Sequence, residues 1–115
     1  MKKVILGLTE KITVIGEKKE TVVARIDTGA TSSSIDYTLA AKLKLGPITK
    51  SKTVKSALGT LKRPVIHAKI KIYDAVVEAE FSLADRSHLK YSVLIGQNIL
   101  KTGNFLIDPN KEAEQ

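Results

Sequence analysis

The sequence predicts a domain built mostly of β-strands, and three observations support this prediction. Five runs of strand length are rich in β-branched residues, turn signals such as Gly16 and Asp74 separate them, and only two short stretches have helical spacing. The predicted strands cover residues 11–15, 21–26, 65–72, 76–83 and 91–95. Lysine alternates with isoleucine in the third run, which is typical of a strand with one face in water.

The two expected helices are both short. Asp36 is a suitable N-cap for a helix over residues 37–43, which places its leucines on one face. A second turn of helix is expected at residues 97–101 and should end at Gly103. The polar tail after Pro109 is expected to be frayed.

Length and composition favour one small domain over residues 1–115. A chain of 115 residues with 43% hydrophobic residues can bury a substantial core. The absence of cysteine excludes disulfides, thiolate nucleophiles and cysteine-bound zinc. The first apolar stretch, residues 4–8, is too short for a signal peptide or a membrane span. We therefore expect a cytoplasmic protein with no membrane partner.

The net charge of +7 raises the question of an acidic partner, such as nucleic acid, a membrane surface or an acidic substrate. The 19 basic residues are scattered, however, and Lys69 and Lys71 alternate with apolar residues as on a solvated sheet face. A nucleic-acid-binding β-barrel would need aromatic residues clustered on a basic face, whereas this chain has three Tyr, two Phe and no Trp, all dispersed. Solubility explains the charge best, and we expect no nucleic-acid partner.

The most informative segment is Asp27-Thr28-Gly29-Ala30, which directly follows an apolar predicted strand. In isolation, this segment can be a simple turn in which Asp27 caps its own backbone. A second segment, residues 91–108, changes that interpretation. It contains an apolar strand that enters a turn at Gly96, then a short helical stretch and another apolar run.

Together, the two segments resemble the retropepsin-like aspartic proteases, in which an Asp-Thr-Gly-Ala segment pairs with a later apolar strand and glycine turn. The resemblance covers about residues 21–109, and the helix after the motif is similar to that of single-domain archaeal and bacterial members. It implies an all-β fold, a closed acid-protease barrel with one or two short helices. It also implies an aspartic endopeptidase that hydrolyses peptide or protein substrates.

The chemistry of this family needs two carboxylates beside one water molecule. Because like charges this close cannot both ionise, one carboxyl group acts as base and the other as acid. This chain has one Asp-Thr-Gly motif, and its other aspartates have other expected roles, such as the helix cap at Asp36 and a hairpin turn at Asp74. A two-fold homodimer would supply Asp27 twice, so we expect Asp27 to be catalytic in a homodimer.

The resemblance also implies roles for the residues after Asp27. Thr28 would support the loop of the partner copy through its hydroxyl, and Gly29 would let the substrate backbone pass and form a hydrogen bond. Ala30 lacks the hydroxyl with which a serine would favour ionised carboxylates, so activity is expected closer to neutral pH. The alternative is that residues 28–34 form only a Ser/Thr-rich turn before the helix.

A flap that covers the substrate is expected over residues 53–62, with Ala57, Leu58 and Gly59 at its tip. The alternative is an ordinary surface hairpin. The sequence Arg63-Pro64 is expected to break the strand that follows, as suits a hairpin that leaves the barrel.

Two positions depart from the family pattern. Where the family usually has an arginine after the second glycine and an acid beyond the first motif, this chain has Gln97 and Thr31. The fold should tolerate this neutral pair, because no single charge is left unpaired. The alternative function follows from the same departure: with a loose dimer or a closed cleft, the barrel would be an inactive or weak peptide- or protein-binding module.

The sequence predicts no metal and no nucleotide cofactor. Residues 84–87 are similar to proteins that carry an ATP-dependent zinc protease label, but the chain has neither a Gly-x-x-x-x-Gly-Lys-Ser/Thr loop nor a His-Glu-x-x-His motif. His67 is expected to be an exposed or hydrogen-bonded strand residue, and His88 is expected at the surface.

Overall fold

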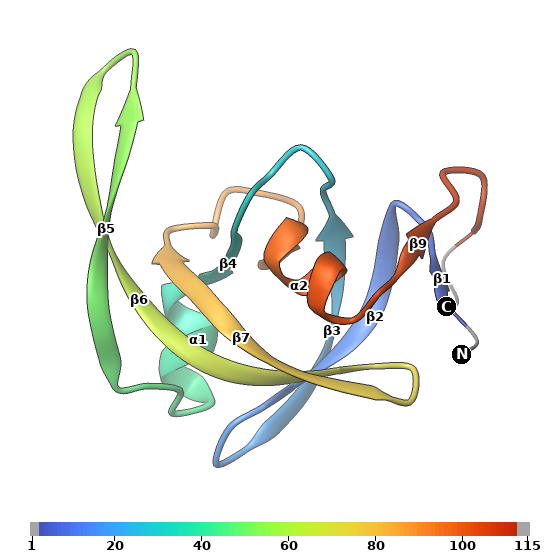
Figure 1. Cartoon of the computed structure of the whole chain (residues 1–115). Coiled ribbons are helices and arrows are strands. Elements are labelled where there is room, and N and C mark those ends of the chain that lie inside the picture. The colour runs from blue at the N-terminus through green and yellow to red at the C-terminus, as the bar shows by residue number, and fades with distance from the viewer. Residues whose placement is uncertain (1–2, 113–115) are drawn as a thin grey trace.

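Six strands close into a barrel in the computed structural model, which describes residues 3–112 (Figure 1). Around the barrel the order is β2-β3-β8-β4-β7-β6, and β6 pairs back with β2. These strands are β2 (Thr9–Ile15), β3 (Lys19–Ile26), β4 (Ser33–Asp36), β6 (Gly59–Ile72), β7 (Ala75–Ala84) and β8 (Val93–Ile95). With the helices α1 (Tyr37–Lys42) and α2 (Gln97–Thr102), this confirms the predicted all-β closed barrel with two short helices.

The barrel closes over a core of aliphatic side chains that alternate along the strands. In β2, for example, Ile12 and Val14 point inward and are buried, whereas the neighbouring Lys11, Thr13 and Ile15 are more exposed. Ile70, Phe81 and Ile95 from three other strands are also fully buried. In β6 the alternation confirms the pattern predicted for residues 69–72, where the isoleucines are buried and the lysines are exposed. Among the described residues, no helix is long and apolar enough to cross a membrane.

Strand β4 is not among the strands predicted from the sequence. All four of its residues are buried, and it lies between β7 and β8. Its three polar residues can be buried because each has a hydrogen-bond partner. Ser33 contacts Asn98 and the Gly96 amide. The Arg86 side chain donates to the Ser34 hydroxyl, and the Arg86 amide donates to the Asp36 carboxylate.

The two helices begin and end nearly as predicted. The Asp36 carboxylate accepts a hydrogen bond from the Thr38 amide at 3.0 Å, which confirms it as the N-cap of α1. Gly103 is the C-cap of α2, which also confirms the expected end of that helix.

The predicted hairpin over residues 53–62 is present as the outer part of a long arm that projects from the barrel (Figure 1). Strand β5 (Ile48–Ser56) pairs with β6 in register up to Ser56 and Gly59. The expected break at Arg63-Pro64 is wrong, because β6 runs continuously through both residues. At Pro64, β6 pairs only with β5, since pairing with β7 begins at Val65, and proline is tolerated where one strand edge is open.

The two ends of the described chain are fastened together. Strand β1 (Ile5–Leu6) pairs in parallel with β9 (Leu106–Ile107), and the side chain of Lys111 donates hydrogen bonds to the Ile5 carbonyl and to the buried Glu10 carboxylate. Partial burial alone would lower the pKa of Lys111, but the hydrogen bonds to Tyr73 and Glu10 outweigh it and raise this pKa. The tail was expected to fray directly after Pro109, and this is wrong for the segment up to Lys111, which is held by these hydrogen bonds. Residues 113–115 of the tail lie outside the described part.

Candidate active site

Asp27 lies directly after β3, where the barrel strand ends in the loop of residues 27–32, called here the active-site loop. Its amide donates to the Ile95 carbonyl at 2.9 Å, which ties the start of this loop to the end of β8. Its side chain is half-buried, and Oδ1 accepts a hydrogen bond from the Gly29 amide at 2.9 Å. The carboxylate is thus oriented from within its own motif but still reachable.

The turn at Gly96 packs against the far side of the same loop. The Gly96 amide donates to the Ser33 hydroxyl at 2.9 Å, and the Gln97 amide donates to the Ala30 carbonyl at 2.8 Å. A side-chain carbon at Gly96 would lie 2.2 Å from the Ser32 carbonyl oxygen, so only glycine permits this approach. The structure therefore brings together the two segments that carried the resemblance.

A hydrogen-bonded pair, the buried Ser33 and the half-buried Asn98, was missed by the sequence reasoning. The Ser33 hydroxyl donates to Asn98 Oδ1 at 2.7 Å, and Asn98 Nδ2 donates to the Glu80 carbonyl on β7 at 3.0 Å. Because Ser33 also accepts from Gly96, this pair joins β4, α2 and β7 behind the active-site loop. A polar side chain one residue beyond Gln97 was the available signal, but a single sequence does not reveal its partner.

The neutral residues that replace the usual arginine and acid are not paired with each other. Gln97 Nε2 instead donates to the Thr28 carbonyl oxygen at 2.7 Å, and Thr31 is an exposed residue of the loop. The expectation of a direct neutral substitute for the charged pair is therefore corrected. The Gln97 side chain contacts the active-site loop at Thr28 and not at Thr31.

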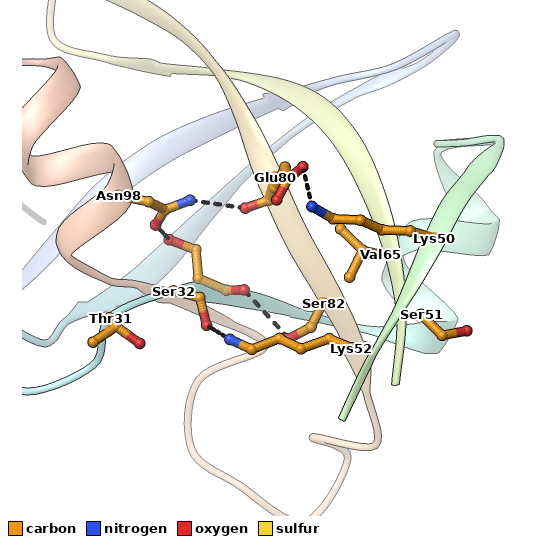
Figure 2. Close-up of a pocket in the computed structure, with 10 residues that line it drawn as sticks. Thr31, Ser32, Lys50, Ser51, Lys52, Val65, Glu80, Ser82 and Asn98 are labelled. Carbon is orange, nitrogen blue, oxygen red and sulfur yellow. Dashed lines mark hydrogen bonds and ion pairs between the residues drawn. The ribbon is translucent and has the colours of Figure 1, made fainter. Parts of the chain in front are cut away.

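A cavity of about 460 Å³ opens between the active-site loop, the arm and β7 (Figure 2). Lys52 Nζ donates to the Ser32 hydroxyl at 2.5 Å on one side, and Lys50 Nζ lies 3.0 Å from Glu80 Oε2 on the other (Figure 2). The hydrogen bond from Lys50 lowers the pKa of Glu80, and nearby His67 adds to the effect. The cavity is lined by Thr31, Ser32, Ser33, Lys50, Ser51, Lys52, Val65, Glu80, Ser82 and Asn98.

The three predicted flap residues lie at the end of the arm. Ala57 and Leu58 form the two-residue turn, and Gly59 begins β6 with a φ of +123°. None of the three lines the cavity beside the active-site loop in this single copy of residues 3–112. Their role as a flap remains a prediction.

The other aspartates near helices and turns are engaged locally. Asp85 accepts hydrogen bonds from Ser87, which lower its pKa, and Asp108 accepts from the Asn110 amide. His67 is an exposed strand residue whose Nε2 lies 3.4 Å from Glu80 Oε2, and His88 is exposed, as expected. Across the described residues, no group of three or more potential ligands is placed to hold a metal ion.

The fold is shared with solved structures. A Legionella pneumophila protein of unknown function is 26% identical, with a TM-score of 0.71 over 97% of this chain and 98% of that chain. EIAV protease, solved with the inhibitor HBY-793, is 17% identical, with a TM-score of 0.67 over 84% of this chain and 88% of that chain. Simian foamy virus (mac) protease is 18% identical, with a TM-score of 0.61 over 79% and 89% of the two chains. These likenesses confirm the acid-protease barrel that the sequence predicted.

The sequence itself also matches a family model. No curated protein is similar enough to count as a relative. The model described as retropepsin-like aspartic endopeptidase RimB matches residues 40–115, more than half of the chain, in a segment that holds Gly96 and Gln97 and begins after Asp27. With Asp27 and Gly96 joined in one barrel, the chain belongs to the RimB-like family of retropepsin-like aspartic endopeptidases.

Proposed function

We propose that this protein is an aspartic endopeptidase that hydrolyses peptide bonds as a homodimer, with one Asp27 from each copy. The observation that carries the proposal is the placement of Asp27: a reachable carboxylate at a strand end, fixed by Gly29 and backed by the Gly96 turn. The chain contains this Asp-Thr-Gly motif once, so a site with two such carboxylates needs a second copy.

The proposed mechanism uses the two Asp27 carboxyl groups in opposite protonation states. The ionised one takes a proton from a water molecule whose oxygen attacks the scissile carbonyl carbon, while the protonated one gives its proton to the carbonyl oxygen. The tetrahedral intermediate then collapses: the bond between carbon and the amide nitrogen breaks, and the first carboxyl group gives its proton to that nitrogen. A hydroxyl group of the intermediate returns a proton to the second carboxylate, which restores the starting state of the pair. No metal or cofactor takes part in these steps.

Apolar residues near the active-site loop support a two-fold arrangement. Leu8, whose carbonyl accepts from the Ile26 amide next to Asp27, is 54% exposed. Thr28 and Gln97 border a second cavity of about 390 Å³ that is partly lined by Leu100, Phe105 and Ile107. A two-fold axis through the active-site loops would set such apolar surfaces of the two copies against each other.

The cavity of Figure 2 is the proposed place for part of the substrate, because it opens beside the active-site loop and under the arm. The tip of the arm would then close over bound peptide and exclude water. Leu58 is fully exposed in the single copy, as expected for a residue that contacts either substrate or the partner copy.

Dilution tests the dimer. We expect specific peptidase activity, measured on a mixed peptide library, to fall in direct proportion to the protein concentration once that concentration is below the dimer dissociation constant. Total activity should then fall with the square of the concentration, in parallel with the change from dimer to monomer in sedimentation. A protein that is monomeric at tens of micromolar and cleaves no peptide would contradict the proposal and leave the peptide-binding module. Isothermal titration calorimetry would then measure whether the protein binds peptides without cleaving them.

Gly59→Ala tests the flap. An added methyl group meets no atom within 4 Å, but the φ of +123° is strained for alanine. Alanine would therefore restrict the backbone angles available to the tip and hinder its movement over the substrate. We expect kcat to fall several-fold, with a loss in unfolding free energy of only about 1 to 2 kcal/mol. Amide hydrogen exchange over residues 56–61 should be fast in the free protein and slow with a substrate-like inhibitor. Exchange that is slow in both states would identify an immobile hairpin.

A further inference from the structure

One peptide group of the active-site loop, the Thr28–Gly29 peptide, is held at both of its ends. Its N–H, on Gly29, donates to Asp27 Oδ1 at 2.9 Å. Its carbonyl oxygen, on Thr28, accepts from Gln97 Nε2 at 2.7 Å. In a planar trans peptide these two groups point in opposite directions, so Gln97 and the Asp27 carboxylate lie on opposite sides of the same peptide group.

One further hydrogen bond closes the turn around this peptide group: the Ala30 amide donates to the Asp27 carbonyl at 3.3 Å. A turn of this kind allows its central peptide two opposite orientations, so this hydrogen bond alone does not fix the direction of the Gly29 N–H. Thr28 and Gly29 are both exposed, so side-chain packing does not hold them. Rotation of the peptide plane would move the Gly29 N–H away from Asp27, and glycine offers little resistance to such a rotation. The orientation of the N–H that contacts Asp27 therefore depends on the hydrogen bond at the carbonyl end.

Gln97 is well placed to supply that hydrogen bond. Its own amide is bound to the Ala30 carbonyl, and the preceding Gly96 is bound to Ser33 and packed against Ser32, so the backbone that carries the side chain is fixed. Hydrogen bonds that act in series through one peptide also polarise each other, which strengthens the Gly29 contact to a carboxylate. The donor is neutral, so it works in the same way at every pH at which the protein is folded.

We propose that Gln97 is a positioning residue of the active site, which orients and polarises the Thr28–Gly29 peptide against Asp27. Its expected effect on kcat rests on the proposed endopeptidase function. The hydrogen-bond series itself does not depend on activity. Gln97 thereby supports the catalytic motif from within the same chain, at the position where the family usually has an arginine.

Two substitutions of nearly equal size separate positioning from simple packing. Gln97→Met keeps the length of the side chain but has no donor, and we expect kcat to fall by about threefold to tenfold with little change in the urea midpoint. Gln97→Glu is ionised near neutral pH, has no hydrogen to donate and repels the Thr28 carbonyl, so the expected fall is larger. Lys18→Gln is the control: it lies in the exposed β2–β3 turn, changes the net charge by the same amount as Gln97→Glu, and should retain wild-type kcat.

The pH dependence gives a signature that loss of packing cannot produce. At each pH, the kcat of a variant is divided by that of the wild-type protein. For Gln97→Glu this ratio should rise toward one as the pH falls through the glutamate range, about 4.3, because the protonated carboxyl group regains a donor. For Gln97→Met it should stay constant. A flat ratio for Gln97→Glu, or wild-type kcat in Gln97→Met, would overturn the inference.

A measurement that needs no activity separates this inference from the proposed function. In carbon-13-labelled protein, Gln97→Met should shift the Thr28 carbonyl resonance and speed hydrogen exchange at Gly29 relative to Lys18→Gln. Unchanged values would overturn the role of Gln97 whether or not the protein is a peptidase. A wild-type protein that cleaves no peptide, but in which both signals respond, would overturn the proposed function and support the hydrogen-bond series.

Discussion

Asp27→Asn is expected to abolish peptide cleavage, lowering kcat by at least about a thousandfold. Both copies then carry an amide at this position, which can neither take a proton from water nor give one to the scissile carbonyl oxygen, so both chemical roles are lost. The fold should persist, because the asparagine side-chain oxygen still accepts the hydrogen bond from Gly29. The dimer should persist or become tighter, since replacing carboxylates at the two-fold axis removes their mutual repulsion.

The measurements are kcat on a mixed peptide library, sedimentation, and circular dichroism of both proteins. Asp74→Asn is a matched control, because it makes the same chemical change at an exposed aspartate in the β6–β7 turn and should retain full activity. Wild-type activity in Asp27→Asn would mean that another residue performs the chemistry.

Gly96→Ala is expected to cause the largest loss of stability of any single methyl addition near the site. The new carbon would lie 2.2 Å from the Ser32 carbonyl oxygen and 2.9 Å from the Ala30 carbonyl oxygen. Both are backbone atoms, which cannot move aside without displacing the active-site loop. We expect the free energy of unfolding to fall by about 3 kcal/mol or more.

Urea denaturation of Gly96→Ala against Gly59→Ala measures this effect with the same chemical change at two glycines. Gly59 has open space around the added carbon, so its variant should remain folded with a much smaller loss. Folded Gly96→Ala should also have a lower kcat, because the hydrogen bonds to Ser33 and Ala30 would be displaced. Equal stability of the two variants would show that the packing between the Gly96 turn and the active-site loop is loose.

The parts of the fold that periodicity encodes were predictable from the sequence. The strands that lead into Asp27 and Gly96 are rich in β-branched residues, and the cap at Asp36 has a local cause. Strand β4 was not predictable, because its burial depends on polar partners far away in the chain, such as Asn98 for Ser33 and Arg86 for Ser34. Strands β1 and β9 have two residues each, too few for a period to appear.

The site was predictable to the extent that its motifs are local. Asp27 and Gly96 could be named and paired through the family resemblance, and the structure does place their segments together. The bond from Gln97 to Thr28 could not be foreseen, since it joins a side chain to a backbone atom 69 positions away and leaves no pattern in the sequence. The continuous strand through Pro64 likewise depends on which neighbours β6 has at that point.

Mixing the wild-type protein with Asp27→Asn tests most directly whether two copies of Asp27 form one site. Equal amounts are allowed to exchange subunits at a concentration far above the dimer dissociation constant, and activity is compared with that of the same total amount of wild-type protein. If each site needs both aspartates, only wild-type homodimers cleave, and activity should be about one quarter. Activity of about one half would show that each chain works alone and would contradict a shared site.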